Sequence, residues 1–271
     1  MSKNIKKKLN TGLKTGAAVL FLTTAAVFLE RLAKATEEPE NIDDGNPYID
    51  SCQVNGEWAS ADALMQTEDA PTLYERFGKR ALDKVLSFFG LIACAPLFGL
   101  IAVAIEIDDP GPVLFKQKRV GKDKRFFEIH KFRSMKTSAP KDVPIEDFEN
   151  QEEYVTRVGR LLRRTYLDEL PQLWDVFRGK MSLVGPRPVI WNTKELIHER
   201  DKYGANSVMP GITGLAQING GNKLDNIKKA EWDGRYVKSL RGGNLEGFLT
   251  DLSCIAETAG VTTEEKNNEC E

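Results

Sequence analysis

The sequence predicts an α/β protein that is mainly helical with a small β-hairpin, and a monotopic membrane protein held by a Pro-broken re-entrant helix. Three observations predict this fold class. An uncharged apolar segment of 21 residues, 85–105, is long enough for a membrane helix. Two short β-rich runs flank a polar turn at 120–123. Apolar residues recur at helical spacing in several of the segments that follow.

Residues 1–75 form an N-terminal extension before the apolar segment. A shorter apolar stretch, 16–29, follows a lysine-rich start and falls below the ~17–25 residues of a spanning helix. A cleaved secretory signal, a short spanning helix and an interfacial helix all stay open for this stretch. Residues 36–70 are acidic and contain no lysine or arginine, which predicts a partly disordered linker.

The long apolar segment is interrupted by Pro96, which lacks the N–H that the helical hydrogen-bond ladder requires. Basic residues precede the segment, between 76 and 84, and a basic run at 116–136 follows it. Positive residues prefer the cytoplasmic side, so positive charge on both flanks disfavours a simple crossing. A helix that bends at Pro96 and leaves the membrane on the side where it entered keeps both positively charged flanks on the cytoplasmic side. The alternative is a buried helix of a soluble protein.

The rest of the chain divides into short elements. Strands at 113–117 and 126–130 are predicted to form the hairpin. After it, the sequence predicts an amphipathic helix at 145–165 and a short helix at 168–177 that carries the sequence Asp-Glu in its first turn. A loop at 182–188 and a helix at 190–203 come next. A glycine-rich loop at 209–221 then leads to a further helix at 225–240. No internal repeat is visible.

The distribution of charge bears on the binding partner, and the cysteine content bears on the cellular compartment. The net charge is −2, but the basic run at 116–136 is typical of a solvated face or a nucleic-acid patch. Its position just after the apolar segment favours anionic lipid or phosphate instead, and we expect no nucleic-acid partner. The four cysteines show neither metal-binding spacing nor a disulfide framework, which is compatible with a reducing compartment.

The most informative stretch is residues 165–172, where Asp168 and Glu169 stand side by side. Two carboxylates beside fixed positive charge suit the handling of phosphates and a divalent metal. An isolated Asp-Glu pair is more often a solvated helix start, so its meaning depends on its surroundings. Here a cluster of arginines precedes it: Arg157, Arg160, Arg163 and Arg164.

Seven motifs follow one another in the order and spacing of a known family. They occupy residues 79–83 (KRALD), 111–121 (GPVLFKQKRVG), 131–135 (KFRSM), 161–165 (LLRRT), 167–173 (LDELPQL), 182–188 (SLVGPRP) and 210–217 (PGITGLAQ). On these residues the chain resembles the bacterial sugar transferases that act on polyprenol phosphate, the monotopic phosphoglycosyl transferase family. The resemblance covers a membrane-anchored domain at 76–252 and leaves 253–271 as a C-terminal tail.

The resemblance implies transfer of a sugar-1-phosphate from a UDP-sugar to undecaprenyl phosphate, with release of UMP. It implies the first step of a bacterial surface glycan, such as an O-antigen, capsule, exopolysaccharide or glycoprotein glycan. It places the protein at the inner membrane with its active site on the cytoplasmic face. In the family the Asp of the pair is the nucleophile that forms a covalent phosphosugar intermediate, and the adjacent Glu helps to bind Mg²⁺. Those roles fall on Asp168 and Glu169.

Further site residues follow from the same resemblance. Arg163 and Arg187 match family arginines near the phosphate site, where a guanidinium offers bidentate contacts. Gln117 and Arg119 are candidate contacts to phosphate. Lys131 and Arg133 are candidate contacts to lipid phosphate or headgroups, and Thr213 and Gln217 are candidate contacts to the nucleotide. A plain hairpin without a ligand is the alternative for the first pair.

Two other functions compete with the transferase. One is a catalytically silent membrane scaffold of the same fold, and the other is a basic membrane-surface or nucleic-acid binding protein. The presence of Asp168, Glu169, Arg163 and Arg187 argues against the scaffold. A basic binding protein would need neither the acidic pair nor the series of loop motifs. The expected partners are a UDP-sugar, undecaprenyl phosphate and membrane lipid, and a homo-oligomer stays open. The residues do not identify the sugar or the glycan pathway.

Overall fold

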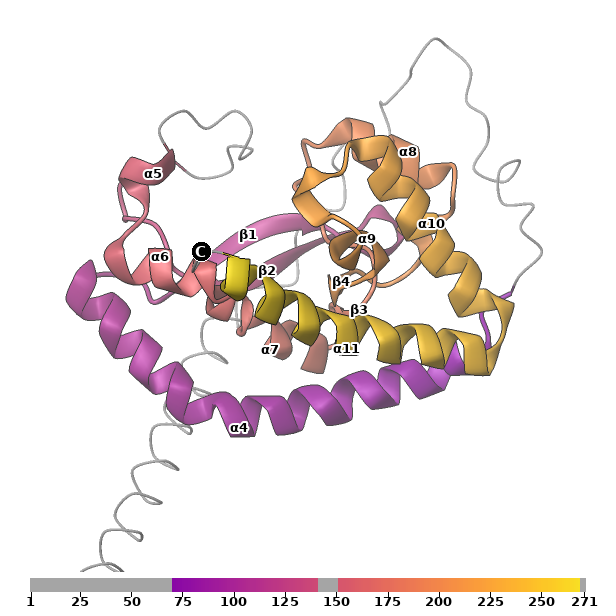
Figure 1. Ribbon diagram of the computed structural model, residues 1–271, viewed down its shortest axis with the longest axis horizontal. Coiled ribbons are helices and arrows are strands. Elements are labelled where there is room, and N and C mark those ends of the chain that lie inside the picture. Colours follow the sequence, from indigo (N-terminus) through magenta and orange to yellow (C-terminus); the bar gives the residue numbers. More distant parts are fainter. Residues whose placement is uncertain (1–69, 141–150, 269–271) are drawn as a thin grey trace, which may run out of the picture.

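The computed structural model describes residues 70–140 and 151–268, so the segment 16–29 and all of 36–70 except its last residue lie outside the described residues. The elements are a π-helical turn Tyr74–Gly78, α4 Lys79–Asp108, β1 Leu114–Val120, β2 Phe126–Phe132, α5 Gln151–Tyr154, α6 Arg157–Arg164, a 3-10 turn Leu167–Glu169, α7 Gln172–Phe177, β3 Ser182–Val184, α8 Lys194–Asp201, β4 Gly211–Thr213, α9 Leu215–Ile218, α10 Asn226–Gly242 and α11 Asn244–Asn268. In Figure 1, α4 lies beneath the hairpin, with α5 and α6 near one end and α8 to α10 toward the other. The prediction of a mainly helical chain with a small β-hairpin is confirmed.

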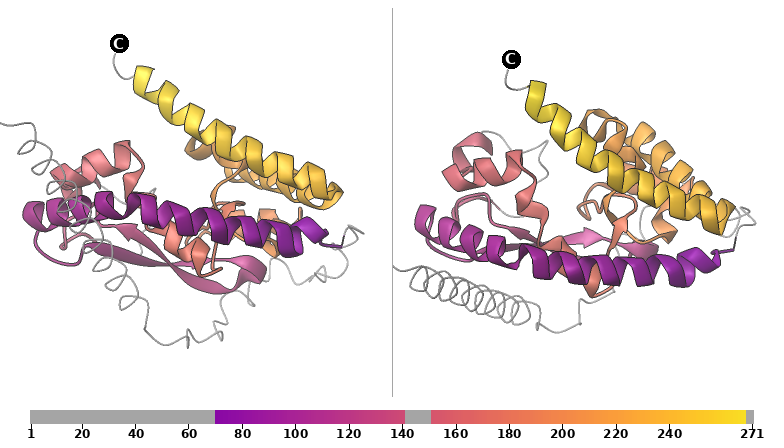
Figure 2. Two further views of the ribbon diagram at one scale, coloured as in Figure 1. Left: turned by 90° about the horizontal axis from the view of Figure 1, so that it is seen from below. Right: turned by 60° about the horizontal axis from the view of Figure 1, so that its bottom comes forward.

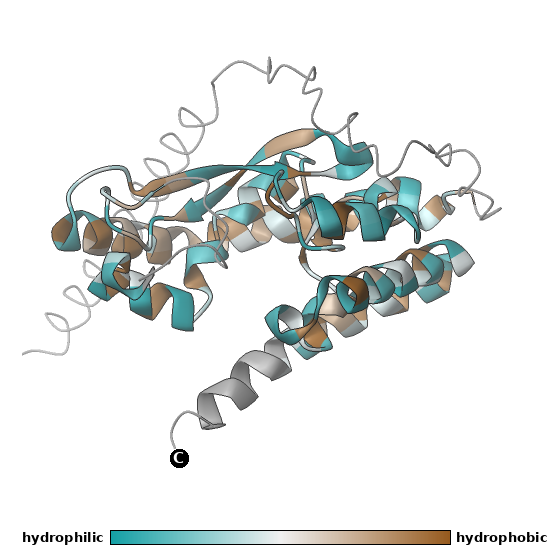
Figure 3. Cartoon of the chain, turned by 90° about the horizontal axis from the view of Figure 1, so that it is seen from above, coloured by the Kyte–Doolittle hydropathy of each residue, from teal (hydrophilic) through white to brown (hydrophobic). Residues whose placement is uncertain are grey.

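Helix α4 has one face on the protein and one face that is apolar and uncovered. Residues that recur every three or four positions are buried, from Lys79 and Asp83 through Phe98 to Ile105. The opposite face exposes large hydrophobic side chains, namely Val85, Leu86, Phe88, Phe89, Ile92, Leu100, Val103 and Ile107. Within the described residues one helix, Tyr74–Asp108, is long and apolar enough to cross a membrane, and only 28% of its most apolar window is buried. In Figure 3, hydrophobic stretches recur along α4, whereas α10 and α11 alternate between hydrophilic and hydrophobic residues. The core helix of a soluble protein would be mostly covered, whereas this face of α4 lies uncovered.

Pro96 lies inside α4 without ending it. The φ that proline fixes is compatible with a helix, so the chain loses one hydrogen bond and bends rather than stopping. Figure 1 shows α4 curving upward at its C-terminal part. The expected break at Pro96 is therefore a bend within one continuous helix.

Both ends of α4 bind the same folded body. At its start, Lys79 Nζ lies 2.7 Å from Asp251 Oδ2 on α11, and Asp83 Oδ1 accepts a 2.9 Å hydrogen bond from the N–H of Leu183 on β3. At its end, Asp108 Oδ2 accepts a 2.8 Å hydrogen bond from the N–H of Val158 on α6. Figure 2 shows α4 extended along one side of the molecule and α11 running from the body toward the C-terminus.

Asp251 is the centre of the polar cluster at the start of α4. Its carboxylate is 2% exposed and accepts hydrogen bonds from the Tyr74 and Tyr236 hydroxyls, at 2.6 and 2.9 Å, besides the Lys79 ammonium. Tyr236 Oη also contacts the carbonyl of Val184 at 3.1 Å. The cluster thus ties α4, α10, α11 and β3 together.

We expect Asp251→Ala to lower the free energy of unfolding by about 3–5 kcal/mol, because it leaves the buried Lys79 charge without its partner. The double variant Lys79→Met/Asp251→Leu, which replaces the pair by apolar groups, should recover most of the loss. Denaturant unfolding in detergent, followed by circular dichroism, measures both. Glu257→Ala, exposed on α11, is the control and should change stability by less than about 0.5 kcal/mol. Equal stability of Asp251→Ala and the control would contradict the assignment.

The predicted hairpin is confirmed, with longer strands than expected. β1 and β2 pair antiparallel from Leu114 opposite Phe132 to Val120 opposite Phe126. Phe127, Ile129 and Phe132 are buried against the protein. This packing carries the C-terminal end of β2, with its basic residues, into the middle of the molecule.

The single helix predicted at 145–165 is wrong for its described part. α5 ends at Tyr154 and α6 begins at Arg157, because the residues between them contact the chain that follows β2: Thr156 N donates to the carbonyl of Ser134 at 3.2 Å. The Thr156 side chain then caps α6 by accepting from the N–H of Gly159 at 2.9 Å. A Cβ at Gly159 would overlap the Ser134 carbonyl, so this approach requires glycine.

The loop predicted at 182–188 is wrong for its first three residues. Ser182–Val184 form strand β3, which pairs in parallel with β4. β4 and α9 both lie in the segment expected to be a glycine-rich loop. The other two helices are confirmed in shorter or shifted form, as α8 and α10. Residue 252, where the domain was expected to end, lies inside α11.

Candidate active site

The Asp-Glu pair lies on a tight turn between α6 and α7. Asp168 and Glu169 belong to the 3-10 turn Leu167–Glu169, which follows Tyr166 in the left-handed region of backbone conformation, with φ 55° and ψ 16°. Asp168 is 9% exposed. The chain reversal at Tyr166 therefore brings the two carboxylates back toward the hairpin and the β3 loop instead of leaving them on a solvated helix start.

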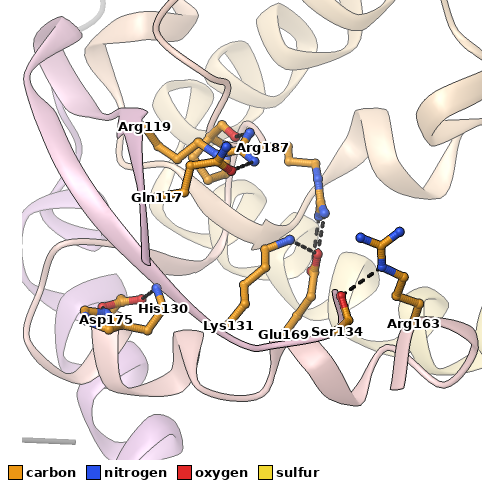
Figure 4. Close-up of polar contacts among 10 residues, drawn as sticks. Gln117, Arg119, His130, Lys131, Ser134, Arg163, Glu169, Asp175 and Arg187 are labelled. Atoms are coloured by element: carbon orange, nitrogen blue, oxygen red, sulfur yellow. Dashed lines mark hydrogen bonds and ion pairs between the residues drawn. The ribbon is translucent and has the colours of Figure 1, made fainter. Parts of the chain in front are cut away.

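Glu169 is held by two cations from distant parts of the chain. Lys131 Nζ, near the end of β2, lies 2.7 Å from Glu169 Oε1. Arg187, in the Gly185–Pro188 loop after β3, donates from both terminal nitrogens to the carboxylate, with Nη1 3.3 Å from Oε2 and Nη2 to Oε1. Figure 4 shows the three side chains converging. Three residues that the sequence put forward separately thus form one cluster.

The two neighbouring carboxylates differ in their electrostatics. Burial raises the pKa of Glu169, but Arg187 and Lys131 outweigh it and bring the pKa down to about 2. Burial raises the pKa of Asp168, and the Glu169 charge adds to this, against opposing effects of Lys131 and Arg163. Glu169 is thus a fixed anion. Asp168 is a more basic carboxylate, as suits a nucleophile, with cations near enough to favour its charged form.

Lys131 and Arg187 respond in opposite directions. Burial lowers the pKa of the Lys131 ammonium, more than the Glu169 carboxylate raises it. Burial also disfavours the charged Arg187, but its contact with Glu169 raises the pKa of that guanidinium overall. Arg187 therefore stays a cation beside the carboxylate pair, where an anionic phosphate group would be attracted.

Arg163 reaches the same region from the last turn of α6. Its Nε donates a 2.9 Å hydrogen bond to Ser134 Oγ, and its charge is one of those that lower the pKa of Asp168. Figure 4 shows Arg163 and Ser134 beside the Glu169 cluster. Sequence reasoning did not single out Ser134, although it follows Arg133 directly in the KFRSM motif.

The Gly185–Pro188 loop is fixed from two sides. Arg119 donates from Nη1 to the carbonyl of Pro188 at 3.2 Å and from Nη2 to Gln117 Oε1 at 2.6 Å. On the other side, the N–H of Gly185 donates to the carbonyl of Thr213 at 2.8 Å. A Cβ at Gly185 would overlap the Met209 carbonyl, so the two loops can approach only through glycine. Arg119 therefore contacts the loop that carries Arg187, and Gln117 holds the Arg119 side chain.

Other predicted site residues have partners away from the Glu169 cluster. Arg133 is 7% exposed and binds Asp109 at the end of α4, through the carbonyl oxygen and through a 3.4 Å ion pair. The Thr213 hydroxyl lies 2.6 Å from that of Thr258 on α11. Both polar atoms of the Gln217 amide are buried without a hydrogen-bond partner in the part of the chain that the structure describes.

A buried pair that the sequence did not reveal as a pair joins β2 to α7. His130 Nδ1 lies 2.7 Å from Asp175 Oδ1, and the His130 N–H donates to Asp175 Oδ2 at 2.9 Å. Burial raises the pKa of Asp175, although its hydrogen bonds to His130 oppose this. His130 precedes Lys131, so the pair fixes the strand end from which Lys131 reaches Glu169. The sequence does not show this pairing, because 45 residues separate the two side chains.

Comparisons with known proteins identify the family of this chain. The family model described as bacterial sugar transferase matches residues 74–265. Undecaprenyl-phosphate glucose phosphotransferase of Komagataeibacter xylinus is 47% identical over 152 residues, which are 54% of this chain and 29% of that protein. UDP-glucose:undecaprenyl-phosphate glucose-1-phosphate transferase of Escherichia coli K12 is 41% identical over 170 residues, 60% of this chain and 36% of that protein.

A third relative is matched over most of its own length. Exopolysaccharide production protein ExoY of Sinorhizobium fredii is 35% identical over 196 residues, 66% of this chain and 83% of that protein. The chain thus spans about a third of the first two relatives and most of the third. The matched region contains α4, the hairpin and the whole Glu169 cluster. The chain belongs to the bacterial sugar transferase family.

Proposed function

We propose that this protein transfers a sugar-1-phosphate from a UDP-sugar to undecaprenyl phosphate and releases UMP. The observation that carries the proposal is the buried Asp168 beside Glu169, whose carboxylate is held by Lys131 and Arg187. A nucleophilic carboxylate needs cations to suppress its repulsion from a pyrophosphate, and this site supplies them. The printed names of two relatives describe glucose-phosphate transfer to the same lipid, which supports the assignment.

The reaction proceeds in two displacements at the same phosphorus. Asp168 Oδ bonds to the β-phosphorus of the donor as the bond from that phosphorus to the bridging oxygen breaks, and UMP leaves with the oxygen. A phosphate oxygen of undecaprenyl phosphate then attacks the same phosphorus and displaces the Asp168 carboxylate. The product is an undecaprenyl diphosphate sugar. Arg163 and Arg187 orient the donor phosphates and offset their charge in both steps.

We further propose that Glu169 helps to bind Mg²⁺. Mg²⁺ in phosphate-handling sites is usually bound by one or two carboxylates together with substrate phosphates. Across residues 70–140 and 151–268, no three His, Cys, Asp or Glu side chains cluster as a metal site, so Glu169 would hold the ion together with donor phosphate oxygens and water. When bound, the ion supplies positive charge to the pyrophosphate.

A panel of UDP-sugars tests the function. The full chain in detergent or nanodiscs is incubated with undecaprenyl phosphate and UDP-glucose, UDP-galactose or N-acetylated UDP-hexoses, and UMP release is followed. We expect one donor to be turned over in a manner that depends on the lipid. No UMP from any donor would favour the catalytically silent scaffold instead.

We also propose that α4 enters and leaves the membrane on the cytoplasmic side of the bacterial inner membrane. Both ends of α4 bind the same polar body, through Asp251 and Leu183 at one end and Val158 at the other. A straight crossing would pull one of these contacts, with its charged or polar groups, into the hydrocarbon core. The uncovered apolar face between the two ends would then lie in the lipid.

Cysteine labelling in sealed inverted membrane vesicles checks this topology. Single cysteines at Arg80 and Lys116, in a chain whose native cysteines are replaced by serine or alanine, should both react with a membrane-impermeant maleimide, because both positions face the cytoplasmic side. A cysteine at exposed Lys202 on the soluble body is the positive control. Reaction at only one of the two test positions would refute the re-entrant arrangement.

A further inference from the structure

Ser134 follows β2, and its backbone lies against the start of α6. Its carbonyl accepts a 3.2 Å hydrogen bond from the N–H of Thr156. A Cβ at Gly159 would overlap that carbonyl, so the two segments are in direct contact. The residue is 9% exposed. A serine hydroxyl oxygen turns about a single torsion with three favoured positions, so a fixed backbone leaves it little freedom. The Ser134 hydroxyl is therefore held in place before any substrate arrives.

The Arg163 side chain meets this hydroxyl. Arg163 lies four residues after Gly159, and residues four apart share one side of a helix. Its Nε donates a 2.9 Å hydrogen bond to Ser134 Oγ. Because a guanidinium is planar and rigid, a contact at Nε sets the direction of its two terminal nitrogens. Figure 4 shows these nitrogens on the side of the group away from Ser134.

The three cations near the carboxylate pair differ in their partners. Lys131 and Arg187 both contact the Glu169 carboxylate. Arg163 has no ion pair in the part of the chain that the structure describes, and its side chain donates there to the neutral Ser134 hydroxyl. A neutral acceptor orients a guanidinium without offsetting its charge, whereas a carboxylate does both. Arg163 thus keeps its charge and its terminal N–H groups for another anion.

The Arg163 charge acts at the nucleophilic end of the site. The carbonyl of Arg163 accepts from the N–H of Tyr166 at 3.2 Å, and the carbonyl of Tyr166 accepts from the N–H of Glu169 at 3.3 Å. One continuous turn therefore links the end of α6 to the carboxylate pair. Burial raises the pKa of Asp168, and Lys131 and Arg163 are the cations that oppose this. A guanidinium so near to Asp168 would meet the phosphate that this carboxylate attacks.

We propose that Ser134 is a positioning residue, which directs the terminal nitrogens of Arg163 at the donor phosphate that Asp168 attacks, an inference that rests on the proposed function. A phosphate takes two parallel N–H bonds from a guanidinium only when the edge of that group faces it. An arginine without the hydroxyl contact would have to be ordered on binding, and the loss of its rotamer freedom opposes this. Ser134 supplies the order beforehand and itself touches no substrate.

Two serine variants separate this role from a general one. Ser134→Ala removes the hydroxyl and keeps the carbonyl contact with Thr156, so the melting temperature should change by less than about 4 °C. Ser207→Ala is the matched control, because Arg241 Nη2 donates to the Ser207 hydroxyl at 2.9 Å, a contact of the same kind outside the Glu169 cluster. Each is made in the full chain, alone and together with Arg163→Ala.

Two measurements follow these variants. UMP release is measured with undecaprenyl phosphate and UDP-glucose, UDP-galactose or UDP-N-acetylglucosamine. Binding of the same three donors is measured by displacement calorimetry in chains that also carry Asp168→Asn, which prevents turnover. The comparison with and without Arg163 is a double-mutant cycle, and it isolates the coupling between the hydroxyl and the guanidinium.

We expect Ser134→Ala to lower kcat/KM for UMP release by about tenfold and to weaken donor binding by about fivefold or more. In chains with Arg163→Ala the same change should have less than about a twofold effect, because the hydroxyl then has no guanidinium to hold. Ser207→Ala should stay within about twofold of its parent throughout. An equal loss with and without Arg163 would mean that the hydroxyl acts on its own, and would overturn the proposal. Unchanged donor binding by Ser134→Ala would overturn it as well.

The same data distinguish this inference from the proposed function. A wild-type chain that binds a UDP-sugar and releases no UMP refutes the transfer reaction, while the binding cycle still decides the role of Ser134. Turnover by the wild type with additive losses in the cycle refutes the positioning role alone. Absence of binding to every donor refutes both.

Discussion

Asp168→Asn is expected to reduce UMP release by more than about 10³-fold, as removal of a covalent nucleophile does in other enzymes. The amide has nearly the shape of the carboxylate but does not bond to phosphorus. Because burial already raises the pKa of Asp168, a neutral side chain at this place should leave the fold intact. UMP release by the purified variant measures the loss of activity. Its melting temperature and its binding to membranes show whether the fold is intact.

A second readout tests the covalent step itself. Without undecaprenyl phosphate, the wild type should release about one UMP per active site and retain the labelled phosphosugar on the protein, whereas Asp168→Asn should do neither. Asp123→Asn is the matched control, because Asp123 is exposed in the hairpin turn at φ 54°, a conformation that asparagine adopts readily. If Asp168→Asn releases UMP at a rate within about tenfold of this control, Asp168 is not the nucleophile.

Glu169→Gln is expected to reduce UMP release by about 10²-fold or more and to raise the Mg²⁺ concentration needed for half-maximal activity. The amide still accepts hydrogen bonds, but it neutralises neither Lys131 nor Arg187 and is a poor ligand for Mg²⁺. The measurement is UMP release over a Mg²⁺ titration, together with calorimetric binding of Mg²⁺ to the purified chain.

The control for Glu169→Gln is Glu128→Gln, an exposed glutamate on β2 opposite Lys118. Loss of the buried anion also leaves two cations facing each other, so the melting temperature of Glu169→Gln should fall while that of the control should not. Glu169→Asp keeps the charge and should retain more stability than Glu169→Gln. An unchanged Mg²⁺ requirement in a folded Glu169→Gln would exclude Glu169 as the metal ligand.

The ion pairs of Glu169 also bear on how the site prepares for its substrate. Lys131 and Arg187 offset the cost of burying one carboxylate, and the same two cations are where an incoming pyrophosphate would find its counter-charge. Donor phosphates therefore compete with Glu169 for the guanidinium and the ammonium. Such competition would free the carboxylate for a metal when the donor is bound.

Local elements were predictable to the extent that neighbouring residues determine them. The hairpin followed from β-rich runs around a polar turn, and α4 followed from its uncharged apolar length. Prediction failed where distant backbone took part. Thr156 ends the expected helix because it pairs with the chain after β2, and Ser182–Val184 is a strand only because β4 lies beside it. Neither partner is visible in the local pattern.

The same division holds for the candidate site. The sequence by itself determined that the Asp168-Glu169 pair, the arginines and the motif series are present, because they can be read directly from the order of residues and its local periodicity. Only the tertiary structure decided their partners, since Lys131 and Arg187 reach Glu169 across 38 and 18 residues of chain. In the structure both cations contact Glu169, Arg119 donates to the carbonyl of Pro188 and Arg133 binds Asp109. Burial, hydrogen bonding and charge pairing are three-dimensional properties, and they separate a fixed anion from a more basic neighbouring carboxylate where the sequence shows only two acids in a row.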